Sequence, residues 1–227
     1  MKPYYSDDLV TIYHGDCREW MPEADAVITD PPYGVDVQYG DSYTDERAGY
    51  WGWFRPVVGQ MRASAPVVAF THTSEALRYI TDWDWLGCWH KPVSFSIRIG
   101  NSPIVPHWEP IFMFGIHSLG VQRDALHDVI TASPVGNNTR LALFGRERRA
   151  QSVGDAHPVV KPMSLFSALV AGLTDVSAVV LDPFMGSGTT LVAAKSLGRK
   201  SIGIEIEERY CEIAANRCRQ EVLGLTA

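Results

Sequence analysis

Short runs of continuously apolar residues, rich in Val, Ile and Phe, recur along this chain of 227 residues. A strand with one face in water alternates apolar and polar residues, whereas a continuously apolar run is typical of a strand buried on both faces. Segments with helical spacing lie between several of these runs. Because strands that alternate with helices form parallel sheets covered on both faces, the sequence predicts a doubly wound α/β fold.

The predicted elements cover most of the chain. We predict strands at residues 9–13, 26–29, 67–71, 86–89 with a continuation through 93–99, 110–114, 178–181 and 201–204. We predict helices at residues 48–63, 74–81 with Ser74 as its cap, 164–173, 189–197 and 207–223. Residues 117–157 carry turn signals instead, so we expect a single domain over residues 1–227 with an insertion at about 117–157.

Composition limits the class of protein. Hydrophobic residues make up 46% and charged residues 20%, as in ordinary globular domains. No apolar run approaches the roughly 20 residues of a membrane-spanning helix, and the first residues show no signal sequence, so we expect a cytoplasmic protein without membrane partners. The four cysteines, Cys17, Cys88, Cys211 and Cys218, form no Cys-x-x-Cys pair and indicate core thiols rather than a metal site.

Two prolines follow the predicted strand at 26–29 directly, in the stretch Asp30-Pro31-Pro32-Tyr33. Proline has no N–H donor and fixes its own φ, so this stretch ends the strand in a rigid loop. Taken alone, the stretch is compatible with a plain tight turn. An acid and an aromatic ring held this rigidly at the end of a buried strand also fit a binding loop.

A glycine loop lies near the carboxyl end, in the stretch VVLDPFMGSGTT from Val179 to Thr190. A strand, a Gly-x-Gly turn and a helix follow one another there, and glycines let a ligand approach the backbone closely. Glu205 ends the next strand about twenty residues later, where an acid accepts hydrogen bonds from ribose hydroxyls. The loop lacks a third glycine and a Gly-Lys-Ser/Thr ending, so it favours a nucleoside cofactor without a pyrophosphate, although a plain strand–helix turn stays open.

Together the two stretches resemble the signature motifs of the S-adenosylmethionine-dependent amino-methyltransferases of DNA, Asp-Pro-Pro-Tyr and Phe-x-Gly-x-Gly-Thr. The catalytic motif precedes the cofactor motif, as in the permuted β class, and the likeness runs from about residue 10 to about residue 218. It implies a mostly parallel, seven-stranded Rossmann-like sheet with an antiparallel edge hairpin. It also implies S-adenosylmethionine as cofactor, S-adenosylhomocysteine as product, and a bacterial or phage setting such as restriction–modification.

The resemblance assigns residues to the cofactor. Asp16 is placed near the adenine, Lys161 and Pro162 flank the methionine part, and Ser164 caps the helix that follows. The complete expected set is Asp16, Asp30, Lys161, Pro162, Ser164, Asp182, Pro183, Phe184, Gly186, Ser187, Gly188, Thr189, Thr190 and Glu205. His107 and Glu109 open a segment that resembles a family strand, and a hydrogen-bonded strand start explains them equally well.

The chemistry of the implied reaction explains the double proline. The exocyclic amine of adenine is a poor nucleophile because its lone pair is delocalised into the ring. The Asp30 carboxylate and the Pro31 carbonyl are expected to accept both amino hydrogens, while Pro32 keeps the loop rigid. Tyr33 is expected to stack on the flipped-out base. Asp30 favours adenine N6 over cytosine N4, for which relatives usually carry Ser, and an inactive nucleic-acid-binding relative is a further alternative.

Contact with double-stranded DNA is assigned to a local basic region, because the formal net charge is −6. The arginines expected to meet phosphates and recognise the target lie in the insertion and are Arg123, Arg140, Arg146, Arg148 and Arg149. A solvated charged face is the alternative for this run. Trp51 and Trp53 follow the Asp-Pro-Pro-Tyr loop and either close over the base or anchor the next helix. Members of this class are often dimers, so a homodimer stays open.

Overall fold

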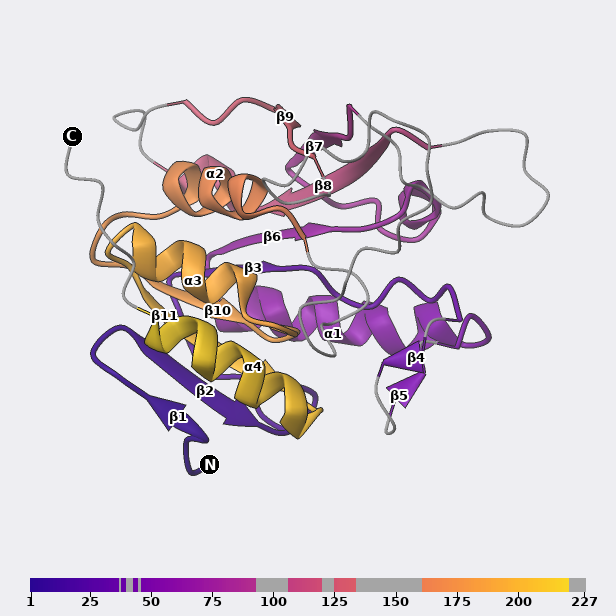
Figure 1. Ribbon diagram of the computed structural model, residues 1–227. Coiled ribbons are helices and arrows are strands. Elements are labelled where there is room, and N and C mark those ends of the chain that lie inside the picture. The colour runs from indigo at the N-terminus through magenta and orange to yellow at the C-terminus, as the bar shows by residue number, and fades with distance from the viewer. Residues whose placement is uncertain are drawn as a thin grey trace, which may run out of the picture.

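The computed structural model describes residues 1–36, 46–92, 106–119, 125–133 and 161–220, and the backbone of residues 38–39 and 43–44. Nine of its strands form one sheet in the order β1-β2-β11-β10-β3-β6-β8-β7-β9 (Figure 1). The five central strands run parallel and are β2 (Val10–His14), β11 (Lys200–Glu205), β10 (Val179–Asp182), β3 (Ala26–Thr29) and β6 (Val67–Thr71).

Shorter or antiparallel strands complete both edges of the sheet. Next to β6 come β8 (Trp108–Phe114) and β7 (Trp85–His90), each antiparallel to its preceding neighbour in the sheet, and then β9 (Val129–Thr131), which is parallel to β7. At the other edge β1 (Tyr5–Ser6) pairs antiparallel with β2. A separate hairpin joins β4 (Gln38–Tyr39) to β5 (Tyr43–Thr44).

Helices cover both faces of the sheet (Figure 1). On one face lie α2 (Met163–Leu173), α3 (Thr189–Ser196) and α4 (Glu208–Arg219), and on the other lies α1 (Tyr50–Ser64). Residues of β3 divide accordingly: Ala26 and Ile28 pack in the core with α2, and Val27 packs in the core with α1. All three are fully buried, which explains why a run of apolar residues without alternation forms this strand.

The doubly wound, mostly parallel sheet with an antiparallel edge is as predicted, and most central strands begin and end within one residue of the expected bounds. The strand count differs, because nine described strands form the sheet where seven are expected. The two additional strands, β1 and β9, contain two and three residues, which are too few to show a strand pattern in the sequence. The strand expected at 93–99, and residues 221–223 of the last helix, lie outside the described residues.

Two predicted helix caps are wrong. The segment expected as a helix at 74–81 is the short 3₁₀ helix η1 (Ser74–Arg78), whose cap position is Thr73 rather than Ser74. A second 3₁₀ turn, η2 (Ile116–Ser118), follows β8. Helix α2 has Pro162 at its cap position, so Ser164 lies inside the first turn instead of capping it, and neither helix start has a side-chain cap bond. Proline is well suited there because a helix start leaves N–H groups unpaired anyway.

The parallel strands bring distant residues to one edge of the sheet. Asp182 and Glu205 are the last residues of β10 and β11, and Asp30 directly follows β3. Ligands of open α/β sheets bind beyond the carboxyl ends of the strands, so this edge is where a site is expected. Within the described parts of the chain, no helix is both long and apolar enough to cross a membrane.

Candidate active site

A pocket lies at this edge of the sheet and joins the two predicted motifs. Its wall contains Asp30, Pro31, Pro32 and Tyr33 on one side and residues of the glycine loop on the other. Every residue of the expected cofactor set lines the pocket except Pro162, Ser164 and Gly188. The fold therefore brings together two stretches that are about 150 residues apart in the sequence.

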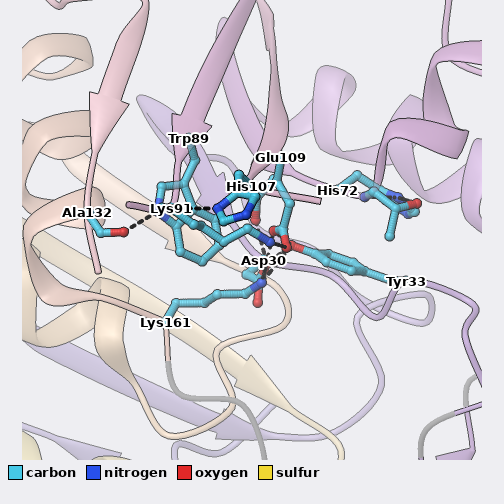
Figure 2. A network of polar contacts seen from close by, with 11 residues as sticks. Asp30, Tyr33, His72, Trp89, Lys91, His107, Glu109, Ala132 and Lys161 are labelled. Atoms are coloured by element: carbon cyan, nitrogen blue, oxygen red, sulfur yellow. Dashed lines mark hydrogen bonds and ion pairs between the residues drawn. The ribbon is translucent and has the colours of Figure 1, made fainter. Parts of the chain in front are cut away.

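The carboxylate of Asp30 is held through one of its two oxygens (Figure 2). Its Oδ1 accepts a hydrogen bond from the Tyr33 hydroxyl at 2.7 Å and another from the Thr71 hydroxyl, and the Lys161 ammonium lies 3.2 Å away. Among the described residues no donor reaches Oδ2, nor does one reach the carbonyl of Pro31. These two oxygens are therefore available to a ligand in the pocket.

Behind Asp30 lies a buried network of charged groups (Figure 2). Lys161 donates to the Tyr33 hydroxyl oxygen at 2.7 Å and lies 3.3 Å from Glu109 Oε2, while Lys91 donates to Glu109 Oε1 at 2.7 Å. The Tyr33 hydroxyl is also 2.9 Å from Glu109 Oε2. Both lysine side chains are only 8% exposed, so these contacts replace most of the water that the charges would otherwise keep.

Opposite charges keep the ions of this network ionised. Burial acts to lower the pKa of Lys161, but the carboxylates of Asp30 and Glu109 outweigh it and raise that pKa. Burial acts to raise the pKa of Glu109, but Lys161 and Lys91 outweigh it and lower that pKa. Burial raises the pKa of Tyr33 well above its ordinary value, and the carboxylates of Asp30 and Glu109 add to this effect. Tyr33 is therefore a neutral hydroxyl between charged neighbours.

A second set of contacts supports the loop from behind. The hydroxyl of Tyr50, on α1, donates to the Pro32 carbonyl and lies 2.9 Å from Nε2 of His72. The amide of Thr73 donates to Nδ1 of His72 at 2.8 Å, so Nδ1 carries no proton and Nε2 carries the proton of a neutral ring. Burial lowers the pKa of His72 to about 3, in agreement with a neutral ring. His72 stacks on Tyr33 with ring centroids 4.8 Å apart.

The glycine loop is held by two buried carboxylates. Asp182 accepts hydrogen bonds from the Thr29 hydroxyl at 2.6 Å and from the Phe184 amide at 3.1 Å, and burial raises its pKa to about 6. Glu205 accepts from the Gly186 amide at 3.0 Å and from the Glu207 amide at 2.9 Å, and burial raises its pKa to about 7. Each oxygen of Glu205 accepts one amide and keeps a lone pair for a further donor.

Glycine is required at Gly188 for packing as well as for a turn. Its φ is +80°, a left-handed conformation, and a Cβ there would lie 2.8 Å from the Cβ of Ala214 on α4. Arg217, one turn further along α4, donates from Nη1 to the Ser187 carbonyl at 2.6 Å and to the Ser187 hydroxyl at 2.9 Å. The loop is thus fastened to α4, which sequence reasoning did not foresee.

The remaining walls come from the segment after β2 and from α1. Nε of Arg18 donates to both oxygens of Asp16, at 2.9 and 2.8 Å, and this lowers the pKa of Asp16. Cys17 lines the pocket, but burial raises the pKa of its thiol to about 12, so it stays protonated. Trp53 lines the pocket, whereas Trp51 stacks on Tyr79 with ring centroids 4.3 Å apart.

Some predicted residues lie outside the described part of the chain, and some residues of the site were not predicted. The arginines expected to contact DNA, Arg123, Arg140, Arg146, Arg148 and Arg149, lie outside the described residues. Sequence reasoning left Glu109 undecided and missed Lys91, Thr71, His72 and Arg217. The resemblance of the segment beginning at His107 to a family strand is the signal that pointed to Glu109. No cluster of His, Cys, Asp and Glu that could hold a metal ion occurs in the part of the chain that the structure describes.

A Rossmann-like sheet whose carboxyl edge joins an Asp-Pro-Pro-Tyr loop to a glycine loop has the architecture of a nucleoside-cofactor methyltransferase. Residues 89–216 match the family model N6_N4_Mtase, described as DNA methylase. The chain belongs to this DNA methylase family.

Two curated relatives are similar in sequence to nearly the whole of this chain. Type II methyltransferase M.ScaI of Streptomyces caespitosus is 27% identical over 99% of this chain and 86% of its own length. Type II methyltransferase M.BamHI of Bacillus amyloliquefaciens is 26% identical over 97% of this chain and 60% of its own length.

Two solved structures have the same fold. The M1.HpyAVI–SAM complex has a TM-score of 0.62 at 24% identity and covers 93% of this chain and 100% of its own. The PvuII DNA methyltransferase, titled cytosine-N4-specific, has a TM-score of 0.69 at 17% identity and covers 98% of this chain and 90% of its own.

Proposed function

We propose that this DNA methylase transfers a methyl group from S-adenosylmethionine to the N6 amine of an adenine flipped out of double-stranded DNA. The observation that carries the proposal is the pair of available acceptors, Asp30 Oδ2 and the Pro31 carbonyl, on a loop that lines the pocket. An exocyclic amine has two hydrogens to donate, and the loop offers two oxygens without competing donors among the described residues.

The pocket fits the charge and shape of this cofactor. S-adenosylmethionine supplies an electrophilic methyl group on a sulfonium, and it carries no phosphate. The pocket wall contains four carboxylates, Asp16, Asp30, Asp182 and Glu205, while the two cations in the wall, Arg18 and Lys161, are paired with acids. Such a wall attracts a cationic sulfonium and repels a pyrophosphate. The fold likeness to the M1.HpyAVI–SAM complex supports the same choice.

Residues of this chain have separate roles in the proposed reaction. Glu205 and Asp16 accept from the nucleoside, and the glycine loop leaves room for it. Asp30 and Pro31 accept both amine hydrogens, which draws the nitrogen lone pair out of the ring before the methyl group arrives. The proton that leaves the methylated amine passes toward Asp30. Tyr33 supports the base by stacking, which offsets part of the cost of flipping.

Cytosine N4 is the alternative substrate. The PvuII enzyme, whose title specifies cytosine N4, has this fold over nearly the whole of the present chain, so the fold is compatible with either base. Asp30 supports adenine, because the resemblance associates Ser with cytosine. Incubation with methyl-labelled S-adenosylmethionine and duplex DNA, followed by digestion to nucleosides, decides between them. Label on N6-methyladenosine supports the proposal, and label on the cytosine amine corrects the base. No label with the cofactor bound points to another substrate or a missing partner, and no label without cofactor binding supports the inactive relative.

Target recognition belongs, in this proposal, to the insertion at about 117–157 of a single catalytic domain. Part of it, β9, extends the sheet beside β7. Replacing Arg146, Arg148 and Arg149 by Ala together should weaken DNA binding and reduce the slope of log K against log salt by about 0.9 for each phosphate that the protein no longer neutralises. An unchanged slope would remove these arginines from the interface. Sedimentation of the free protein would decide whether it is a homodimer.

A further inference from the structure

We propose that Lys161 is a positioning residue for methyl transfer, which acts through the Tyr33 hydroxyl and Asp30 Oδ1 to hold Asp30 Oδ2 where the amine arrives. The inference rests on the proposed function and deepens it. It also changes the role expected for Lys161, from the methionine part of the cofactor to the reactive loop.

The donors of Lys161 are all in use. An ammonium has three N–H groups, and Lys161 has three acceptors within 3.3 Å: the Tyr33 hydroxyl oxygen, Asp30 Oδ1 and Glu109 Oε2. The side chain is 8% exposed, so water has little access to it. No N–H remains for a cofactor carboxylate unless one of these contacts breaks. Lys161 is therefore fully engaged by Glu109 and by the loop that holds the amine acceptor.

The orientation of Asp30 depends on this cation. Three groups bind or approach Oδ1 and none of the described donors reaches Oδ2, so the carboxylate is anchored by one oxygen and presents the other. Tyr33 and Thr71 lose their bonds to Oδ1 when their hydroxyl hydrogens rotate away, whereas an ammonium presents an N–H donor and a positive charge to Oδ1 in every rotation of its hydrogens. Lys161 therefore prevents a turn of the carboxyl group that a hydroxyl alone would permit.

Glu109 and Lys91 fix Lys161 in turn. Glu109 bridges the two lysines, with Lys91 on Oε1 at 2.7 Å and Lys161 near Oε2 at 3.3 Å. With Asp30, the group contains two cations and two anions and is balanced in charge. Buried ion pairs of this kind seldom stabilise a fold more than apolar residues of the same volume would, so a role in geometry explains them better. On the backbone side, Lys161 directly precedes Pro162 at the start of α2, whose Leu165 and Phe166 are buried in the core.

The test compares Lys161→Met, Tyr33→Phe and the double variant in a double-mutant cycle. A residue that acts through the Tyr33 hydroxyl gives non-additive effects, because either single change breaks the same chain of contacts. We expect kcat of Lys161→Met to fall about 100-fold, as small misplacements of reacting groups do. The double variant should be hardly slower than the slower single variant. The Kd for S-adenosylmethionine should stay within about twofold, since the loop and Glu109 take all donors of Lys161.

Lys195→Met is the matched control. Lys195, on α3, also pairs with a carboxylate, Asp7 at 2.6 Å, and lies outside the pocket wall, so its loss should leave kcat unchanged. If Lys161→Met does not fold, as judged by thermal unfolding, Glu109→Gln replaces it in the same cycle, since Gln keeps the shape and removes the charge that holds Lys161.

Two results would overturn the inference. One is weaker cofactor binding in Lys161→Met with kcat unchanged at saturating cofactor, which would return Lys161 to the cofactor. The other is additive losses in the cycle, which would leave only a structural role. Both results are interpreted only if the wild-type protein methylates DNA in the same assay. A wild type that labels no DNA amine overturns the proposed function instead, and label on cytosine corrects the base while leaving the cycle valid.

Discussion

The Tyr33 hydroxyl binds Asp30 through Oδ1, at 2.7 Å, and leaves Oδ2 to the pocket. The two residues are three apart on a loop whose intervening residues are both proline, so their separation is set by the backbone. Oδ1 is bound by the protein, and Oδ2 is available to the substrate. Asp30 Oδ2 is therefore oriented before any base arrives, which is what preorganisation requires.

Asp30→Asn should abolish most of the activity while the protein still folds and binds its cofactor. The amide oxygen must face Lys161, because an ammonium donates only, and the NH₂ group then replaces Oδ2 and repels the amine of the base. We expect kcat to fall about 10²- to 10³-fold, a loss typical of removing one preorganised group. Methyl transfer under saturating cofactor measures it, with the exposed Asp8→Asn as control. Activity within a few fold of wild type would contradict the role of Oδ2.

Gly34→Ala should destabilise the protein and displace the Asp-Pro-Pro-Tyr loop. Gly34 has φ +66°, and a Cβ there would lie 2.4 Å from Cγ of Tyr50, whose hydroxyl holds the Pro32 carbonyl. Left-handed strain alone costs about 1–2 kcal/mol, and the clash adds to it. Chemical denaturation measures the free energy of unfolding. Gly59→Ala is the control, since this helical glycine meets nothing within 4 Å and alanine there should stabilise by about 0.5–1 kcal/mol.

Arg217→Met should weaken cofactor binding without touching the reactive loop. Arg217 holds the carbonyl and hydroxyl of Ser187 from α4, and it keeps the glycine loop in the shape that lines the pocket. We expect the Kd for S-adenosylmethionine to rise about tenfold, the equivalent of one hydrogen bond to a charged group, with a smaller change in kcat. Arg219→Met, two residues away and bonded to Asn216 at 2.6 Å, should bind as wild type does. Equal effects from both variants would contradict a specific role.

The sheet and the two loops could be predicted from the sequence because their signals are local. The run at 26–28 is apolar throughout, and the structure buries its residues on both faces. The motif at Asp30 and the glycine turn at Gly186 each lie within a few residues of a strand end, so their position at the edge of the sheet follows from the fold class.

The ionic network could not be predicted, because it depends on the register between two neighbouring strands and on a contact with a segment far away in the sequence. Lys91 meets Glu109 because β7 and β8 are antiparallel in a register that sets Trp89 opposite Glu109. A shift of that register would separate the two charges. Lys161 reaches the same point from the start of α2, more than fifty residues further along the chain. Sequence spacing contains none of this information.

Glu205 predicts a specific dependence of stability on pH. Burial raises its pKa from an ordinary value of 4.5 to about 7 in the folded protein. The folded state therefore binds more protons than the unfolded state between pH 4.5 and 7, so this group lowers the free energy of unfolding as the pH rises through that window. Below pH 4.5 this loss of unfolding free energy is absent, and above pH 7 it is complete, on the order of 3 kcal/mol.

Denaturation at a series of pH values should show a shallower decline of the free energy of unfolding for Glu205→Gln than for the wild type, because Gln does not titrate. Asp182, with its pKa raised to about 6, contributes a decline of its own that should survive in this variant. Parallel curves for the two proteins would mean that Glu205 titrates normally and is not held in the buried, amide-bound position.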